Sequence, residues 1–75
     1  MIEVFKTNVK GQDEAAWLVN LINSVFESYM VNFDLEDCDR IMRIKCDEAA
    51  IDSDSVIALL SYSGFTAEIL EDNLA

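Results

Sequence analysis

Apolar residues recur along the chain with two different spacings, which predict alternating strands and helices. Residues 2–9 mix Ile, Val, Phe and Thr with polar residues and are predicted to form a strand. The adjacent Val4 and Phe5 leave open which face of this strand is buried. Asp13 precedes a predicted helix whose apolar residues fall on one face: Ala15, Leu18, Leu21, Ile22, Val25 and Phe26. Trp17 lies at the edge of that face and is expected to be partly exposed.

From Tyr29 the apolar spacing changes to two, which is typical of strands with one buried face. Two such stretches are separated by the polar residues 37–40, whose length suits a hairpin loop. A hairpin closed by this loop pairs apolar residues on one face, namely Leu35 with Met42, Phe33 with Ile44 and Val31 with Cys46. On the other face it pairs Asp34 with Arg43 and Asn32 with Lys45.

A second helix is predicted to begin at Asp52 or Ser53, because both residue types are good N-caps. One face of this helix is expected to hold Val56, Leu59, Leu60 and Ser63. Gly64 can take the left-handed conformation that ends helices, and residues 65–70 resume an extended pattern. The last residues, 71–75, are expected to fray.

The predicted order of elements is strand, helix, strand, strand, helix, strand within a single domain, residues 1–75. This order predicts an α+β, ferredoxin-like βαββαβ sandwich, in which two helices cover one face of an antiparallel four-stranded sheet. A chain of 75 residues has room for one core, which excludes a multidomain enzyme.

The chain is strongly acidic, with 15 Asp and Glu residues against 5 Lys and Arg residues and a formal net charge of -10. Such a field repels nucleic acid and anionic lipid and favours a basic partner. The apolar content of 52% predicts a folded chain rather than a disordered acidic segment. Because the sequence shows neither a long apolar run nor a signal-peptide pattern at its start, we expect a cytoplasmic protein without membrane insertion.

Three stretches of the chain follow the order and spacing of one known family. Residues 5–15 read FKTNVKGQDEA, residues 31–36 read VNFDLE, and residues 56–65 read VIALLSYSGF. Together they resemble the heavy-metal-associated domain family, which includes small copper chaperones and the soluble domains of metal-transporting ATPases. The resemblance covers residues 2–70 and implies a ferredoxin-like fold and a link to metal homeostasis.

The chain lacks the metal motif of that family. The family binds a soft metal through two cysteines separated by two residues, and the resemblance places those positions at Gly11 and Glu14. Glycine offers no side-chain ligand and a carboxylate is a hard ligand, whereas Cu(I) prefers sulfur. We therefore expect no bound metal and no cofactor in the first loop.

The two cysteines, Cys38 and Cys46, are not expected to replace this motif within one chain. One lies in the predicted hairpin turn and the other along the next strand, which at about 3.3 Å per residue separates them by more than about 20 Å. Neither a shared metal ion nor a disulfide between them is expected. Cys46 is predicted to be a buried core residue, and Cys38 an exposed thiol whose neighbours Asp37 and Asp39 disfavour the thiolate.

Three other functions fit the sequence less well: calcium binding, acyl carriage and catalysis. A calcium-binding EF-hand loop starting at Asp52 needs glycine at its sixth position, where Ile57 stands, so the turn carboxylates offer at most weak Mg²⁺ or Ca²⁺ association. An acyl carrier protein would fit the short acidic chain and residues 52–55, DSDS, but carriers are all-helical and residues 29–46 alternate with period two. The absence of histidine, of a glycine-rich phosphate loop and of a nucleophile motif predicts that the protein is not an enzyme.

These observations predict a degenerate heavy-metal-associated-like domain that acts as a protein-interaction module. In the family the first loop meets the partner domain, which makes six residues the candidate contacts: Lys10, Gly11, Gln12, Asp13, Glu14 and Trp17. Trp17 has a second interpretation as a residue at the rim of the core. The expected partner is a basic protein or a metal-transport domain, bound less tightly as salt rises. The alternative function is a metal chaperone that uses Cys38 in a dimer, or surface carboxylates.

Overall fold

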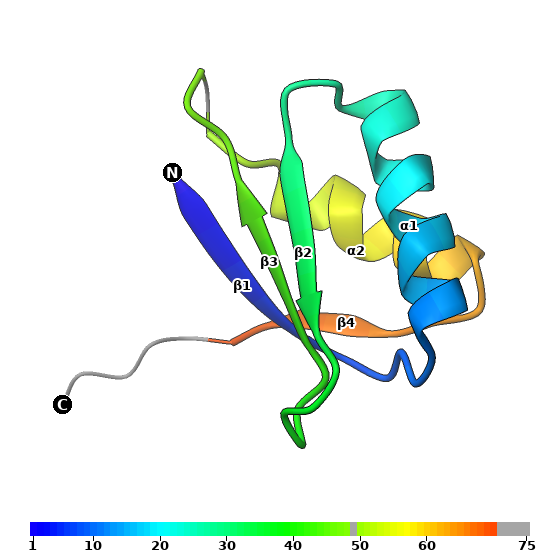
Figure 1. Ribbon diagram of the computed structural model, residues 1–75. Coiled ribbons are helices and arrows are strands. Elements are labelled where there is room, and N and C mark those ends of the chain that lie inside the picture. Colours follow the sequence, from blue (N-terminus) through cyan, green and yellow to red (C-terminus); the bar gives the residue numbers. More distant parts are fainter. Residues whose placement is uncertain (49, 71–75) are drawn as a thin grey trace, which may run out of the picture.

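The structure, a computed structural model, describes residues 1–48 and 50–70. Its elements follow the predicted order: β1 (Ile2–Thr7), α1 (Gln12–Val25), β2 (Met30–Asp34), β3 (Ile41–Lys45), α2 (Ser53–Tyr62) and β4 (Ala67–Ile69). The strands form a four-stranded antiparallel sheet in the order β2-β3-β1-β4, and both helices lie against the same face of it (Figure 1). The predicted α+β, ferredoxin-like fold class is confirmed. The predicted fraying of residues 71–75 lies outside the described residues.

The core lies between the sheet and the two helices. The largest fully buried side chains of the described residues are nine: Phe5, Val9, Leu18, Ile22, Met42, Ile44, Cys46, Val56 and Leu60. The structure decides the inward face of β1, because Phe5 lies opposite Met42 of β3 and Thr7 is buried on the same side. Cys46 is buried in this cluster, as predicted.

Helix α1 starts two residues earlier than predicted, with Gly11 rather than Asp13 preceding the helix. The Glu14 side chain accepts the N–H of Gly11, the N-cap residue. Asp13 is therefore not the N-cap and lies in the first turn of the helix. At the other end Val25 is exposed, contrary to the prediction. Phe26, predicted on the same face, does pack against the core, and its ring stacks on the buried Tyr29 at a centroid distance of 4.5 Å.

The hairpin has the predicted faces but not the predicted register. Phe33 lies opposite Met42 and Val31 opposite Ile44, so the observed pairing is two residues away from the predicted one. The expected polar pairs are also wrong: Asp34 lies opposite Ile41, Asn32 opposite Arg43 and Met30 opposite Lys45. A shift by two leaves every side chain on its face, so the apolar pattern does not discriminate between the two registers.

The observed register requires a longer loop, residues 35–40, which its own hydrogen bonds hold closed. The Arg40 guanidinium donates to the Leu35 carbonyl oxygen at 3.1 Å, and the Arg40 N–H donates to the Asp37 carbonyl oxygen at 3.0 Å. Arg40 has a positive φ of 49°, which turns the chain into β3.

Helix α2 begins and ends as predicted. Asp52 is the N-cap, with one carboxylate oxygen accepting the Ser55 N–H at 3.2 Å and the other accepting the Ser55 hydroxyl at 2.7 Å. Gly64 follows the helix with a φ of 89°, the left-handed conformation that glycine adopts without strain. Strand β4 then covers only Ala67–Ile69, which is shorter than the predicted 65–70.

Candidate functional site

The alternation of strands and helices brings three loops to one end of the molecule. There the Arg40 guanidinium donates to the Lys10 carbonyl oxygen at 3.4 Å, which joins the hairpin loop to the loop between β1 and α1. The Asn8 side chain accepts the Thr66 N–H at 2.8 Å, which joins the same loop to the connection before β4. We call this region, residues 8–14, 35–40 and 64–66, the loop end.

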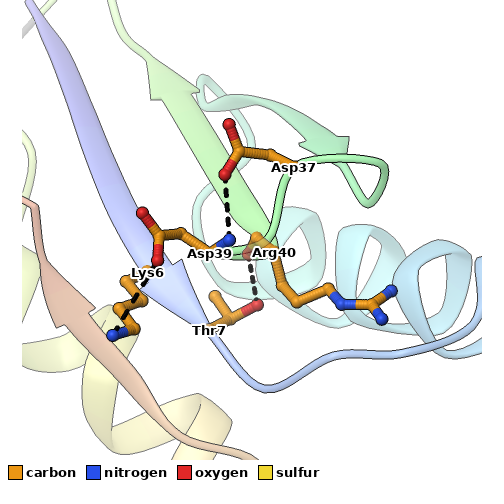
Figure 2. Close-up of polar contacts among 5 residues, drawn as sticks. All are labelled: Lys6, Thr7, Asp37, Asp39 and Arg40. Carbon is orange, nitrogen blue, oxygen red and sulfur yellow. Dashed lines mark hydrogen bonds and ion pairs between the residues drawn. The ribbon is translucent and has the colours of Figure 1, made fainter.

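The hairpin loop is fastened to the end of β1 by several polar contacts (Figure 2). The Thr7 hydroxyl donates to the Arg40 carbonyl oxygen at 2.6 Å, and the Thr7 N–H donates to the Asp39 carbonyl oxygen at 3.1 Å. The Lys6 ammonium lies 3.9 Å from the Asp39 carboxylate, and an Asp37 carboxylate oxygen accepts the Asp39 N–H at 2.9 Å. Asp37 and Asp39 are therefore already engaged in holding the turn.

Gly11 and Glu14, which the resemblance aligns with the family's metal ligands, lie next to one another in this structure. Glu14 Oε1 accepts the N–H groups of Lys10 at 3.3 Å and of Gly11 at 3.2 Å. A Cβ added at Gly11 would lie 3.8 Å from the same oxygen. Glu14 thus satisfies backbone donors at the start of α1, a structural role that the spacing of a capping box explains.

The six candidate contact residues lie before and within the first two turns of α1, and we call them the first-loop surface (residues 10–14 and 17). Lys10, Gln12, Asp13 and Glu14 are exposed, and 54% of Trp17 is exposed, in agreement with its predicted partial exposure. On a helix, residues three and four apart are neighbours, so Asp13 and Glu14 both lie one turn before Trp17. Trp17 therefore follows two acidic residues by one turn, and the Glu14 carboxylate is the one that also accepts the Lys10 and Gly11 N–H groups.

The two cysteines lie in different environments, as predicted. Cys38 is exposed in the hairpin loop, whereas Cys46 is buried with its sulfur 3.6 Å from the Ser28 hydroxyl, and the two are not bonded to each other. The ligand atoms of Asp37, Cys38 and Asp39 all lie within 4.8 Å of one another. Sequence reasoning missed that this turn lies beside the first loop, because the contact depends on the Arg40 side chain reaching the Lys10 carbonyl.

An open pocket of ≈ 260 Å³ lies where β1 ends and β4 begins, lined by Lys6, Thr7, Asn8, Thr66, Ala67 and Glu68. Its ammonium and carboxylate sit on residues opposite one another in the sheet, Lys6 and Glu68. Among the described residues no buried side-chain nitrogen or oxygen lacks a hydrogen-bond partner. Asp52 is the N-cap of α2, and its pKa is lowered from the ordinary value. The larger cause is the hydrogen bond from the Ser55 side chain, and the smaller is the hydrogen bond from the Ser55 backbone.

No family model matches the chain, and no curated protein or solved structure matches it at a significant level. None of the helices within residues 1–48 and 50–70 is long and apolar enough to cross a membrane.

Proposed function

We propose that this protein is a small cytoplasmic protein-interaction module, a heavy-metal-associated-like domain without the family's metal site, which binds a basic partner through its first-loop surface. The observation that carries the proposal is Trp17, which is half exposed on α1 and lies one turn after Asp13 and Glu14. The likeness of residues 2–70 to the heavy-metal-associated family supports the same surface, because that family meets its partners at this loop.

The chemistry of this surface suits an arginine or lysine side chain. A cation placed over an exposed indole gains about 0.5–1 kcal/mol, and adjacent carboxylates add charge-assisted hydrogen bonds. The net charge of -10 raises the rate at which a basic protein encounters the surface. A metal-transport domain with a basic face, or another basic protein, meets this description.

The proposal is tested by affinity capture from cell extract, followed by titration of the purified partner against the wild type and two variants. Trp17→Ala and the double variant Asp13→Asn/Glu14→Gln are expected to weaken binding by about tenfold, equivalent to about 1.4 kcal/mol. The control Asp47→Asn/Glu48→Gln removes the same charge from exposed residues outside the surface and is expected to leave binding unchanged.

Salt gives an independent readout, since a partner held by exposed charges binds less tightly as ionic strength rises. Circular dichroism of each variant confirms that α1 is intact. Partners captured equally by wild type and Trp17→Ala, or bound equally at low and high salt, would refute the proposed surface.

We also propose a second candidate function, metal binding by the hairpin loop, on the ground that Asp37, Cys38 and Asp39 bring three ligand atoms within 4.8 Å of one another. A thiolate and two carboxylates suit Zn²⁺, and two chains can complete a tetrahedral site. Sedimentation with and without Zn²⁺ tests this function, which predicts metal-dependent dimers that Cys38→Ala abolishes. Dimers that persist in Cys38→Ala but not in Asp37→Asn/Asp39→Asn would assign the metal to the carboxylates instead.

A further inference from the structure

One face of the sheet is turned away from both helices (Figure 1). The strand registers assign to it the even-numbered residues of β1, β2 and β4 and the odd-numbered residues of β3. We call this side of the sheet the open face. Phe5, Phe33 and Met42, which share a row of the register, belong to the opposite face that forms the core.

The open face has a charge balance unlike that of the rest of the protein. It carries three of the chain's 5 cations, Lys6, Arg43 and Lys45, and two of its 15 acids, Asp34 and Glu68. The remaining residues hold two cations and thirteen acids. A protein of net charge -10 therefore presents one face whose own balance is positive.

Arg43 and Lys45 stand next to each other on this face, and neither has an acidic residue directly opposite it in the sheet. Arg43 lies between Val4 and Asn32, and Lys45 lies between Ile2 and Met30. Neither cation is within ion-pair distance of a carboxylate among the described residues, whereas the Lys6 ammonium is paired with Asp39 at 3.9 Å. Two like charges two residues apart on one strand repel each other, and an anionic partner would relieve that repulsion.

Exposed aliphatic side chains flank these cations. Ile2 is 63% exposed and Met30 is 59% exposed, one on each side of Lys45, and the half-buried Val4 lies beside Arg43. Each cation on this face therefore has an apolar side chain beside it in the neighbouring strand. Such a surface is complementary to a segment that presents both apolar side chains and carboxylates.

We propose that the open face is a second binding surface, which takes an acidic amphipathic segment of another protein. Carboxylates of the segment pair with Arg43 and Lys45, while its apolar side chains cover Ile2 and Met30. At 0.15 M salt the Debye length is about 8 Å, so a narrow segment on this face is attracted by the local cations and screened from the acids on the far side. This proposal is independent of the first-loop surface. That surface is proposed to bind a basic partner, whereas the open face binds an acidic one.

A protein segment fits this face better than nucleic acid or lipid does. Single-stranded nucleic acid binds through stacking on aromatic side chains, and the described residues of the open face include none. A flat anionic membrane that reached Arg43 would also approach Asp34 and Glu68 at the edges of the face. A narrow peptide avoids those acids.

The experiment is selection of peptides from a random phage-displayed library on the wild-type protein at near-physiological salt. Selected peptides are expected to combine Asp or Glu with Leu, Ile or Val. The tightest peptide is then synthesised and titrated by fluorescence anisotropy. Arg43→Gln/Lys45→Gln and Met30→Ser are each expected to weaken its binding by about tenfold, equivalent to about 1.4 kcal/mol. The control Lys10→Gln, which removes a cation outside the open face, is expected to leave it unchanged.

Amide shifts in an NMR titration are expected to map to β2 and β3, and circular dichroism checks that each variant is folded. Selected peptides that are neutral or basic, or that bind Arg43→Gln/Lys45→Gln as tightly as wild type, would overturn the proposal. Binding through the same cations of phosphatidylserine-containing vesicles or polyuridylate, without acidic peptides, would assign the face to another ligand and also overturn it. So would a homodimer that Arg43→Gln/Lys45→Gln dissociates in sedimentation.

Discussion

The Thr7 hydroxyl donates a 2.6 Å hydrogen bond to the carbonyl oxygen of Arg40 and thereby joins the end of β1 to the end of the hairpin loop. Thr7 is 5% exposed and lies on the same face of β1 as the core residue Phe5. Its hydroxyl oxygen also accepts the Val9 N–H at 3.3 Å, at the start of the first loop. One buried side chain thus connects a strand, a loop that carries candidate contacts, and the loop that carries Cys38.

Replacing Thr7 with valine keeps the shape of the side chain and removes both hydrogen bonds. We expect the free energy of unfolding to fall by about 1–3 kcal/mol, because the Arg40 carbonyl and the Val9 N–H lose their partner in a buried place. Urea unfolding measures the change. Thr66→Val, on an exposed residue, is the control and is expected to shift the midpoint much less. Equal midpoints for Thr7→Val and the wild type would contradict this account.

The two glycines of the chain are predicted to respond oppositely to replacement by serine. Gly11 has an extended φ of -117° and lacks a side chain to cap α1, so Gly11→Ser is expected to raise the free energy of unfolding by about 0.5 kcal/mol. Gly64 has a φ of 89°, so Gly64→Ser is expected to lower it by about 1 kcal/mol through backbone strain. Thermal or urea midpoints that move in the same direction for both variants would be inconsistent with these backbone conformations.

Asp52 is predicted to contribute to the acid sensitivity of the fold. Its pKa in the folded state is lowered by hydrogen bonds from the Ser55 hydroxyl and backbone, so its stabilising effect is present above the ordinary pKa of an aspartate and is lost as pH falls through the lowered value. We expect Asp52→Asn, which keeps a good N-cap, to lose less stability than the wild type on acidification below about pH 4.

NMR titration of the Asp52 carboxyl carbon measures this shift directly. Ser55→Ala removes the largest cause, and the pKa of Asp52 should then return toward its ordinary value. An unchanged titration midpoint in Ser55→Ala would show that the hydroxyl is not responsible.

The double variant Gly11→Cys/Glu14→Cys is predicted to gain a soft-metal site. Side chains at these positions approach each other at the start of α1, since a Cβ at Gly11 would lie 3.8 Å from Glu14 Oε1. Two thiolates there provide the ligands that Cu(I) prefers. Competition against a chromophoric chelator measures the affinity, and Glu14→Cys alone is the control with a single new thiol. A folded double variant that takes up no Cu(I) would count against the resemblance to the heavy-metal-associated family.

The sequence by itself determined the order of the elements and the buried face of most of them. Period-two spacing from Tyr29 and the stripe containing Leu18 and Ile22 correctly predicted a sheet covered by two helices. Asp52 and Gly64 correctly marked the start and end of α2. These features follow from local rules, because strand and helix periodicity and capping involve residues only a few positions apart.

Only the tertiary structure decided what depends on distant residues. It set the hairpin register, which pairs Phe33 with Met42 rather than with Ile44, because the Arg40 side chain holds a longer loop than the apolar pattern requires. It chose the inward face of β1 through the neighbouring β3. It also gathered Arg43 and Lys45 with Ile2 and Met30 on one open face, since those residues come from three strands that only the completed sheet places side by side.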